Sequence, residues 1–147
     1  MTFWERYEAP LMFLAVIIIG GTFILAPHRE ADKISANTLE RVSERTQYLM
    51  LRANSKYGHP IHLSPVIIYE PLRDGGEAGY TDCMNVSIHL DSELAIVNPD
   101  TLVNEVLAHE MSHLVHCGIH GDLGNPPHNS EWQDICRFFG GTTLCEP

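Results

Sequence analysis

The spacing of apolar positions changes along the chain, and each change predicts a different element. Apolar residues recur at helical spacing through 39–53, and Asn37 or Thr38 is placed to cap the start of that helix. The β-branched and aromatic run 65–69 predicts a strand. Residues 86–90 alternate between apolar and polar, as a half-buried strand does. The first part of the folded chain is therefore predicted as a helix followed by strands.

Two further helices are predicted in the second half of the chain. Asn98 and Pro99 supply a cap and a favourable first residue, and an apolar stripe follows through Leu114. A loop rich in His and Gly comes next. The last helix begins near Asn129 and ends at the glycine pair 140–141. Together these elements predict a small α+β domain with a short antiparallel or mixed sheet.

The most apolar segment lies near the N-terminus. Residues 9–27 carry no formal charge, and as a helix they would rise roughly 28 Å, close to the hydrocarbon thickness of a bilayer. Trp4 and Tyr7 precede this segment, where an interfacial aromatic belt would sit. We therefore predict a single-pass membrane anchor, or an uncleaved signal, in residues 1–27, ahead of a domain in residues 28–147.

Charge adds an orientation and excludes one class of partner. Only Arg6 precedes the apolar segment, whereas four basic residues follow it by residue 45. The positive-inside rule therefore places the C-terminal domain in the cytoplasm. The whole chain has 9 Lys+Arg against 19 Asp+Glu, a formal net charge of −10. A surface this acidic repels phosphate backbones, which argues against nucleic acid as a partner.

The four cysteines leave their own chemistry open. Cys83, Cys117, Cys136 and Cys145 contain no C-x-x-C pair, so a four-cysteine structural zinc site is not supported. Three disulfide connectivities are possible for four cysteines, and buried free thiols are an equal alternative.

One motif in the helix after Asn98 carries catalytic chemistry, namely His109-Glu110-Met111-Ser112-His113. Residues four apart on a helix lie on one face, so both imidazoles reach a single ion. Glu110 is rotated by about 100° from His109, which sets it beside the metal without making it a ligand. In this arrangement zinc activates a water molecule, and the glutamate takes the proton during attack on a carbonyl. The motif therefore predicts His109 and His113 as zinc ligands and Glu110 as the catalytic base.

A catalytic zinc takes three protein ligands, and three downstream histidines compete for the third place. The metzincin spacing is excluded, because it needs Gly and His where the chain has His116 and Ile119. His128 is favoured, because it stands just before a helix whose Trp132 can pack it beside the first two ligands. His116, on the same helix as the motif, and His120, in the exit loop, stay open as alternatives.

The segments around these histidines resemble the SprT-like metallopeptidases. The resemblance rests on two stretches, His128-Asn129-Ser130-Glu131-Trp132 before the last helix and Gly79-Tyr80-Thr81 before a strand, and it covers roughly residues 37–141. It implies a zincin-like fold in which the zinc ligands are His109, His113 and His128 and the catalyst is Glu110. Asn129 stands where the family has Gly. The family's action on proteins crosslinked to DNA is not expected here, because the chain is acidic.

These observations predict a zinc metallopeptidase that cleaves a protein or peptide substrate and is attached to the membrane through residues 9–27. The strand predicted at 85–90 would offer an edge to an extended substrate. Two other classes stay open: a metal-binding membrane or toxin-like protein without turnover, and a small membrane interaction protein whose histidines are incidental. An intact Glu110 argues against the first of these, because a structural metal site needs no base.

Overall fold

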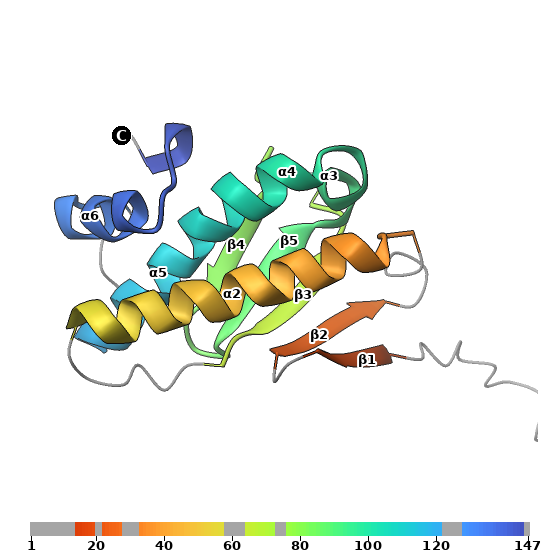
Figure 1. The fold of residues 1–147 in the computed structure, drawn as a ribbon, viewed down its shortest axis with the longest axis horizontal. Helices are drawn as coiled ribbons and strands as arrows, with labels where there is room; N and C mark the ends of the chain where they lie inside the picture. The colour runs from red at the N-terminus through yellow and green to blue at the C-terminus, as the bar shows by residue number, and fades with distance from the viewer. Residues whose placement is uncertain are drawn as a thin grey trace, which may run out of the picture.

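A five-stranded mixed sheet forms the centre of the fold (Figure 1). The computed structural model describes residues 14–19, 22–27, 33–57, 64–72, 76–121 and 128–145. The strands are β1 (Leu14–Ile19), β2 (Thr22–Pro27), β3 (Val66–Glu70), β4 (Gly79–Asp82) and β5 (Ser87–Asp91). Their order across the sheet is β1-β2-β3-β5-β4, with the outer pairs antiparallel and the inner pairs parallel. The prediction of a small α+β fold with a mixed sheet is confirmed.

The predicted N-terminal membrane helix is wrong. Most of that segment forms the hairpin β1–β2, in which Ile19 pairs with Thr22, and β2 then joins β3 in parallel. A continuous apolar run fits a buried strand as well as a helix, and Gly20-Gly21 is a dipeptide that two-residue hairpin loops favour. Residues 9–13 lie outside the described residues.

Membrane attachment therefore loses its support. Among the described residues, no helix has both the length and the apolar character needed to cross a membrane. The single-pass localisation is corrected accordingly, and the cytoplasmic orientation, which rested on that anchor, goes with it.

Helix α2 (Ala36–Tyr57) begins one residue before Asn37, the first of the two residues expected to cap it. The Ser35 hydroxyl accepts a hydrogen bond from the Thr38 amide at 3.1 Å, so Ser35 caps the helix in place of Asn37. The helix packs on one face of the sheet, beside α5 (Figure 1).

A second run of helices lies alongside α2, and its last helix contains the motif His109–His113. It follows the short helix α3 (Ser92–Val97) and consists of α4 (Pro99–Thr101), a π-helical stretch (Leu102–Val106) and α5 (Leu107–His120). Asn98 Oδ1 accepts from the Thr101 amide at 3.3 Å, which confirms the predicted cap. The π-helical stretch directly precedes the motif; such irregular turns occur often at functional sites.

The core lies between the sheet and these two helices. Parallel pairing places Ile67 beside Ile88 and Tyr69 beside Leu90, and all four side chains are fully buried. They meet buried residues of α2 and α5, among them Leu39, Val42, Leu49, Leu107, Met111 and Leu114. This packing anchors α5 to the sheet and so fixes the helix that carries the motif.

Candidate metal centre

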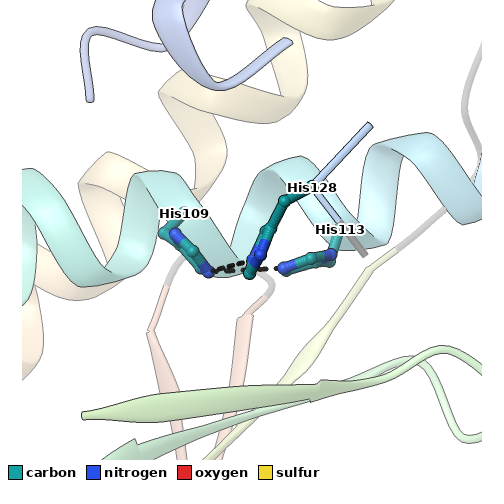
Figure 2. Close-up of side chains that lie close together, drawn as sticks. All are labelled: His109, His113 and His128. Carbon is teal, nitrogen blue, oxygen red and sulfur yellow. Dashed lines mark hydrogen bonds between the residues drawn. The ribbon is translucent and has the colours of Figure 1, made fainter. Parts of the chain in front are cut away.

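Three histidines from two elements meet at one point. His109 and His113 extend from α5, and His128 comes from the turn before α6 (Ser130–Phe138) (Figure 2). His109 Nε2 lies 3.3 Å from His113 Nε2 and 3.2 Å from His128 Nε2. Two ligands bound at about 2.0–2.1 Å to a tetrahedral zinc would be about 3.3 Å apart. The three predicted ligands are thus brought together at the spacing that one metal ion requires.

The protonation of His109 is decided by a main-chain carbonyl. His109 Nδ1 lies 2.9 Å from the carbonyl oxygen of Leu144, and because a carbonyl only accepts, Nδ1 must carry the hydrogen. In the neutral ring, the lone pair is then on Nε2, which is the atom that faces His113 and His128. Metal-binding histidines are held in this way by a partner on their other nitrogen.

Burial favours the neutral form of the two histidines on α5, the form in which an imidazole can bind a metal. Burial lowers the pKa of His113 to about 3, and the neighbouring rings of His109 and His128 lower it further by repelling a positive charge. The pKa of His109 is lowered for the same first reason. Trp132 packs against all three rings with centroid separations of 4.4–4.9 Å, as its position in the sequence predicted. The cluster is a preformed set of nitrogen donors in which burial favours the neutral form of His109 and His113.

The turn that carries His128 is held by the first turn of α6. His128 adopts φ 65°, a left-handed conformation that residues with a Cβ seldom take. Asn129 is extended and caps the helix, since its Oδ1 accepts from the Trp132 amide at 2.8 Å. Gln133 Nε2 donates to the His128 carbonyl at 3.1 Å. Asn129 therefore fits where the family has Gly, because the left-handed residue is His128.

Glu110 lies beside the cluster in an environment suited to a base. Only 5% of the residue is exposed. Burial raises the pKa of its carboxyl to about 7, an effect that a Thr81 hydrogen bond opposes and the charge of Glu77 reinforces. The Thr81 hydroxyl lies 2.8 Å from Glu110 Oε2 and 2.9 Å from its carbonyl oxygen, and its single hydrogen serves one of them at a time. A nearby cation would favour the ionised carboxylate.

A glycine brings β4 close to Glu110. A Cβ on Gly79 would stand 3.0 Å from the His89 carbonyl oxygen and 3.1 Å from Glu110 Cγ, both closer than ordinary contact. Since the His89 oxygen is main chain of β5 and Glu110 belongs to α5, a side chain here would force β4 to shift against both elements. Gly79 is therefore needed for close approach between the strand and the base.

The histidines and Glu110 line a cleft of about 600 Å³, whose other side is formed by β4. Strand β4 is the outer strand of the sheet on this side, while β5 is paired on both sides, with β3 and with β4. The expected substrate edge on residues 85–90 is therefore wrong. The edge beside the candidate metal centre belongs to Gly79–Asp82, a strand that alternation alone does not reveal because it is short and polar.

Both disulfides hold segments of this cleft. Cys83 pairs with Cys117, which ties the β4–β5 turn to α5, and Cys136 pairs with Cys145, which ties α6 to the C-terminal turn. The second disulfide packs against Gly141, where a Cβ would collide with Cys145 Sγ. Of the three pairings that four cysteines allow, the fold selects the one that places a crosslink on each side of the histidines.

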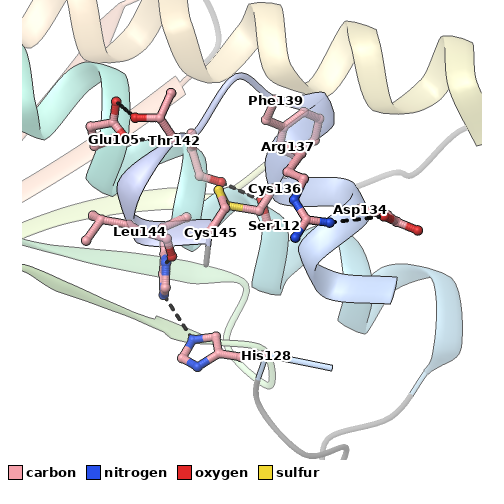
Figure 3. Close-up of a disulfide and its surroundings, with 12 residues drawn as sticks. Glu105, Ser112, His128, Asp134, Cys136, Arg137, Phe139, Thr142, Leu144 and Cys145 are labelled. Carbon is pink, nitrogen blue, oxygen red and sulfur yellow. Dashed lines mark hydrogen bonds and ion pairs between the residues drawn. A yellow bond between two sulfur atoms is a disulfide. The ribbon is translucent and has the colours of Figure 1, made fainter. Parts of the chain in front are cut away.

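The C-terminal turn is held twice (Figure 3). Besides the Cys136–Cys145 bond, the Glu105 carboxylate accepts from the Thr142 amide at 2.9 Å and lies 3.0 Å from the Thr142 hydroxyl. Leu144 lies within this turn, one residue before Cys145. Its carbonyl is therefore presented to His109 by a crosslinked loop.

Removing the second disulfide is expected to loosen zinc binding by about 10–100-fold, the usual cost of losing the group that orients a ligand. The double substitution Cys136→Ala and Cys145→Ala frees Leu144 without leaving thiols that bind zinc themselves. Zinc affinity is measured by competition with a chelating dye. The matched control is the double substitution Cys83→Ala and Cys117→Ala, which removes the other disulfide and leaves the C-terminal turn crosslinked. An unchanged affinity in the double variant would show that the disulfide does not position His109.

The remaining candidates fall outside the three-histidine cluster. His116 and His120 lie further along α5 and group with Glu131 instead. Thr81 and the Leu144 carbonyl were not predicted as part of the site. Thr81 stood in the stretch Gly79-Tyr80-Thr81 that carried the family resemblance, whereas a carbonyl leaves no trace in a sequence because every residue has one.

Comparison with known proteins gives one match. The model of the SprT-like family matches residues 41–146, which include the motif, the cluster and both disulfides. No curated protein and no solved structure matches the chain.

Proposed function

Since the chain belongs to the SprT-like family, we propose that it is a zinc-dependent metallopeptidase that hydrolyses internal peptide bonds of a protein or peptide substrate. The observation that carries this proposal is that His113 Nε2 and His128 Nε2 lie 3.3 and 3.2 Å from His109 Nε2, beside a buried glutamate. We assign the activity to residues 28–147, to whose sheet β1 and β2 add two strands.

His109, His113 and His128 would hold the metal through Nε2. Three neutral nitrogen donors suit zinc, and a catalytic zinc site keeps a further position for water or substrate. When bound, zinc would polarise a water molecule and a substrate carbonyl. The Leu144 carbonyl keeps the lone pair of His109 directed at the position of the metal, and Trp132 restricts the three rings.

Glu110 would accept the proton of the attacking water and pass it to the leaving amine. Its buried carboxyl has little water to stabilise the charged form, so its proton affinity is higher than that of an exposed glutamate. The Thr81 hydroxyl would steady Oε2 and leave the other carboxylate oxygen for the reaction. This division suits a group that must both take and return a proton.

An extended substrate would lie along β4. The main chain of an outer strand has unpaired groups that accept a further strand, and β4 lies in the wall of the cleft. Tyr80 extends from this strand, with its hydroxyl donating to Glu70 at 2.9 Å and its ring stacked 4.1 Å from that of His89. Strand addition would carry a peptide bond past the three histidines.

A metal-binding protein without turnover is the second candidate. The convergence of three histidines supports it equally well, but it gives no role to Glu110, which is buried in the cleft with a raised pKa. A structural site would gain nothing from an ionisable group that is costly to bury. Measurement of turnover separates the two candidates.

The test is cleavage of casein by the full chain. The zinc-loaded protein should cleave it, chelation should abolish cleavage, and zinc added back should restore it. Serine-protease inhibitors on the loaded protein serve as the control and should have no effect. A fully zinc-loaded chain that leaves casein and a mixed peptide library intact would contradict the proposal and favour the binding protein.

A further inference from the structure

A second cluster of metal-ligating side chains lies where α5 ends and α6 begins. His116 and His120 are four residues apart on α5, so their rings share one face, with centroids 4.6 Å apart. Glu131, in the first turn of α6, has Oε1 3.0 Å from His120 Nε2. One ligand atom from each of the three residues lies within 4.8 Å of the others.

We propose that His116, His120 and Glu131 bind a second zinc ion, separate from the candidate catalytic one, which joins α5 to α6. Two imidazoles and one carboxylate form a known zinc donor set. Ligands on one zinc would be about 3.3 Å apart, so the 3.0 Å pair already fits. No separation in the cluster exceeds 4.8 Å, so the excess over this spacing is at most about 1.5 Å, which rotation of the exposed His120 and Glu131 side chains covers.

A simple surface ion pair does not account for all three residues. The pair His120–Glu131 is partly exposed, at 31% and 55% of the side chains, and exposed ion pairs of this kind contribute little to stability. His116, by contrast, is buried with 6% exposed. Two imidazoles on one helix face beside a carboxylate from the next helix are an arrangement that a bound cation would stabilise.

The position of this cluster gives the second ion a structural role. Glu131 comes three residues after His128 and two residues after the cap of α6. The cap residue, Asn129, also faces the cluster, with Nδ2 3.4 Å from His116 Nε2. A cation bridging α5 and Glu131 would fix the beginning of α6, and with it the left-handed turn that presents His128. The site would therefore stabilise the fold around the catalytic ligand.

Zinc stoichiometry tests the proposal. The full chain is stripped by chelation, equilibrated with buffered free zinc and analysed for zinc per chain. The wild type should hold two zinc ions, and Glu131→Gln and His120→Ala should each hold one. Asp134→Asn is the matched control, because Asp134 is another exposed carboxylate of α6 and pairs with Arg137 at 3.7 Å. This variant should still hold two.

Thermal unfolding supplies a second measurement. Glu131 is exposed, so the metal-free melting temperatures of wild type and Glu131→Gln should agree. A ligand that binds the native state stabilises it, so the second equivalent of zinc should raise the melting temperature of the wild type and not that of Glu131→Gln. This comparison keeps the test valid even if a substitution at the buried His116 prevents folding.

The outcomes separate this proposal from the catalytic one. His113→Ala should abolish casein cleavage and still bind one zinc ion. If His113→Ala binds no zinc, or if the wild type binds only one, the second site is refuted while the peptidase proposal stands. Two zinc ions retained in Glu131→Gln would also refute it.

Discussion

Replacing Glu110 by glutamine is expected to reduce kcat by about 10²–10⁴-fold while zinc stays bound, because a positioned general base contributes a factor of that size. Glutamine keeps the length of the side chain and its contact with Thr81, but it has no basic oxygen. Casein cleavage gives the rate, and zinc analysis with circular dichroism confirms that site and fold persist.

The matched comparisons for Glu110→Gln are Thr81→Val and His109→Ala. Thr81→Val removes the hydrogen bond to Oε2 and keeps the base, so its rate should fall far less than that of Glu110→Gln. His109→Ala should lose the catalytic zinc together with activity. A Glu110→Gln protein that cleaves at the wild-type rate would eliminate the glutamate mechanism. Loss of zinc from it would instead identify the carboxylate as a ligand.

The second large effect concerns the third ligand. His128→Ala is expected to weaken zinc binding at the catalytic cluster by more than about 100-fold, since losing a group that merely orients a ligand already costs about 10–100-fold. Activity measured against buffered free zinc reports on this cluster alone, and its midpoint should move to higher zinc concentration by the same factor.

A fold defect is readily separated from this effect. His128 is exposed, and the Gln133 bond to its carbonyl does not involve the side chain, so the metal-free melting temperature should not change. His120→Ala provides the contrast, because it should not move the activity midpoint by a comparable factor. The reverse result, with His128→Ala silent and His120→Ala severely affected, would transfer the third position to His120.

Local sequence determined the helix that carries the chemistry. Asn98 and Pro99 start that run of helices, and the spacing of His109 and His113 places both on one face, because helical geometry relates residues four apart wherever the helix lies. The last helix and its cap at Asn129 were predictable for the same reason. Net charge, too, is a property of composition alone.

Contacts between distant segments decided the rest of the site. His128 was one of three candidates, and the sequence favoured it only through Trp132; its approach to His109 depends on how α6 packs against α5. The other two candidates meet Glu131, a carboxylate that no spacing rule connects to them. The cysteine pairing likewise depends on which turns the fold brings within disulfide reach.

The N-terminal segment shows most clearly where the sequence is ambiguous. Residues 14–27 carry no charge and are mostly apolar, a pattern that fits a membrane helix and a buried strand alike. Only tertiary structure distinguishes them, because β2 satisfies its main-chain hydrogen bonds on the edge of β3, an edge invisible in the segment itself. The sequence by itself determined the elements whose hydrogen bonds are internal, namely the helices, the motif and the donor types. Tertiary structure decided the features whose partners are remote: the pairing of the strands, the disulfides, the Leu144 carbonyl and the histidine that completes the cluster.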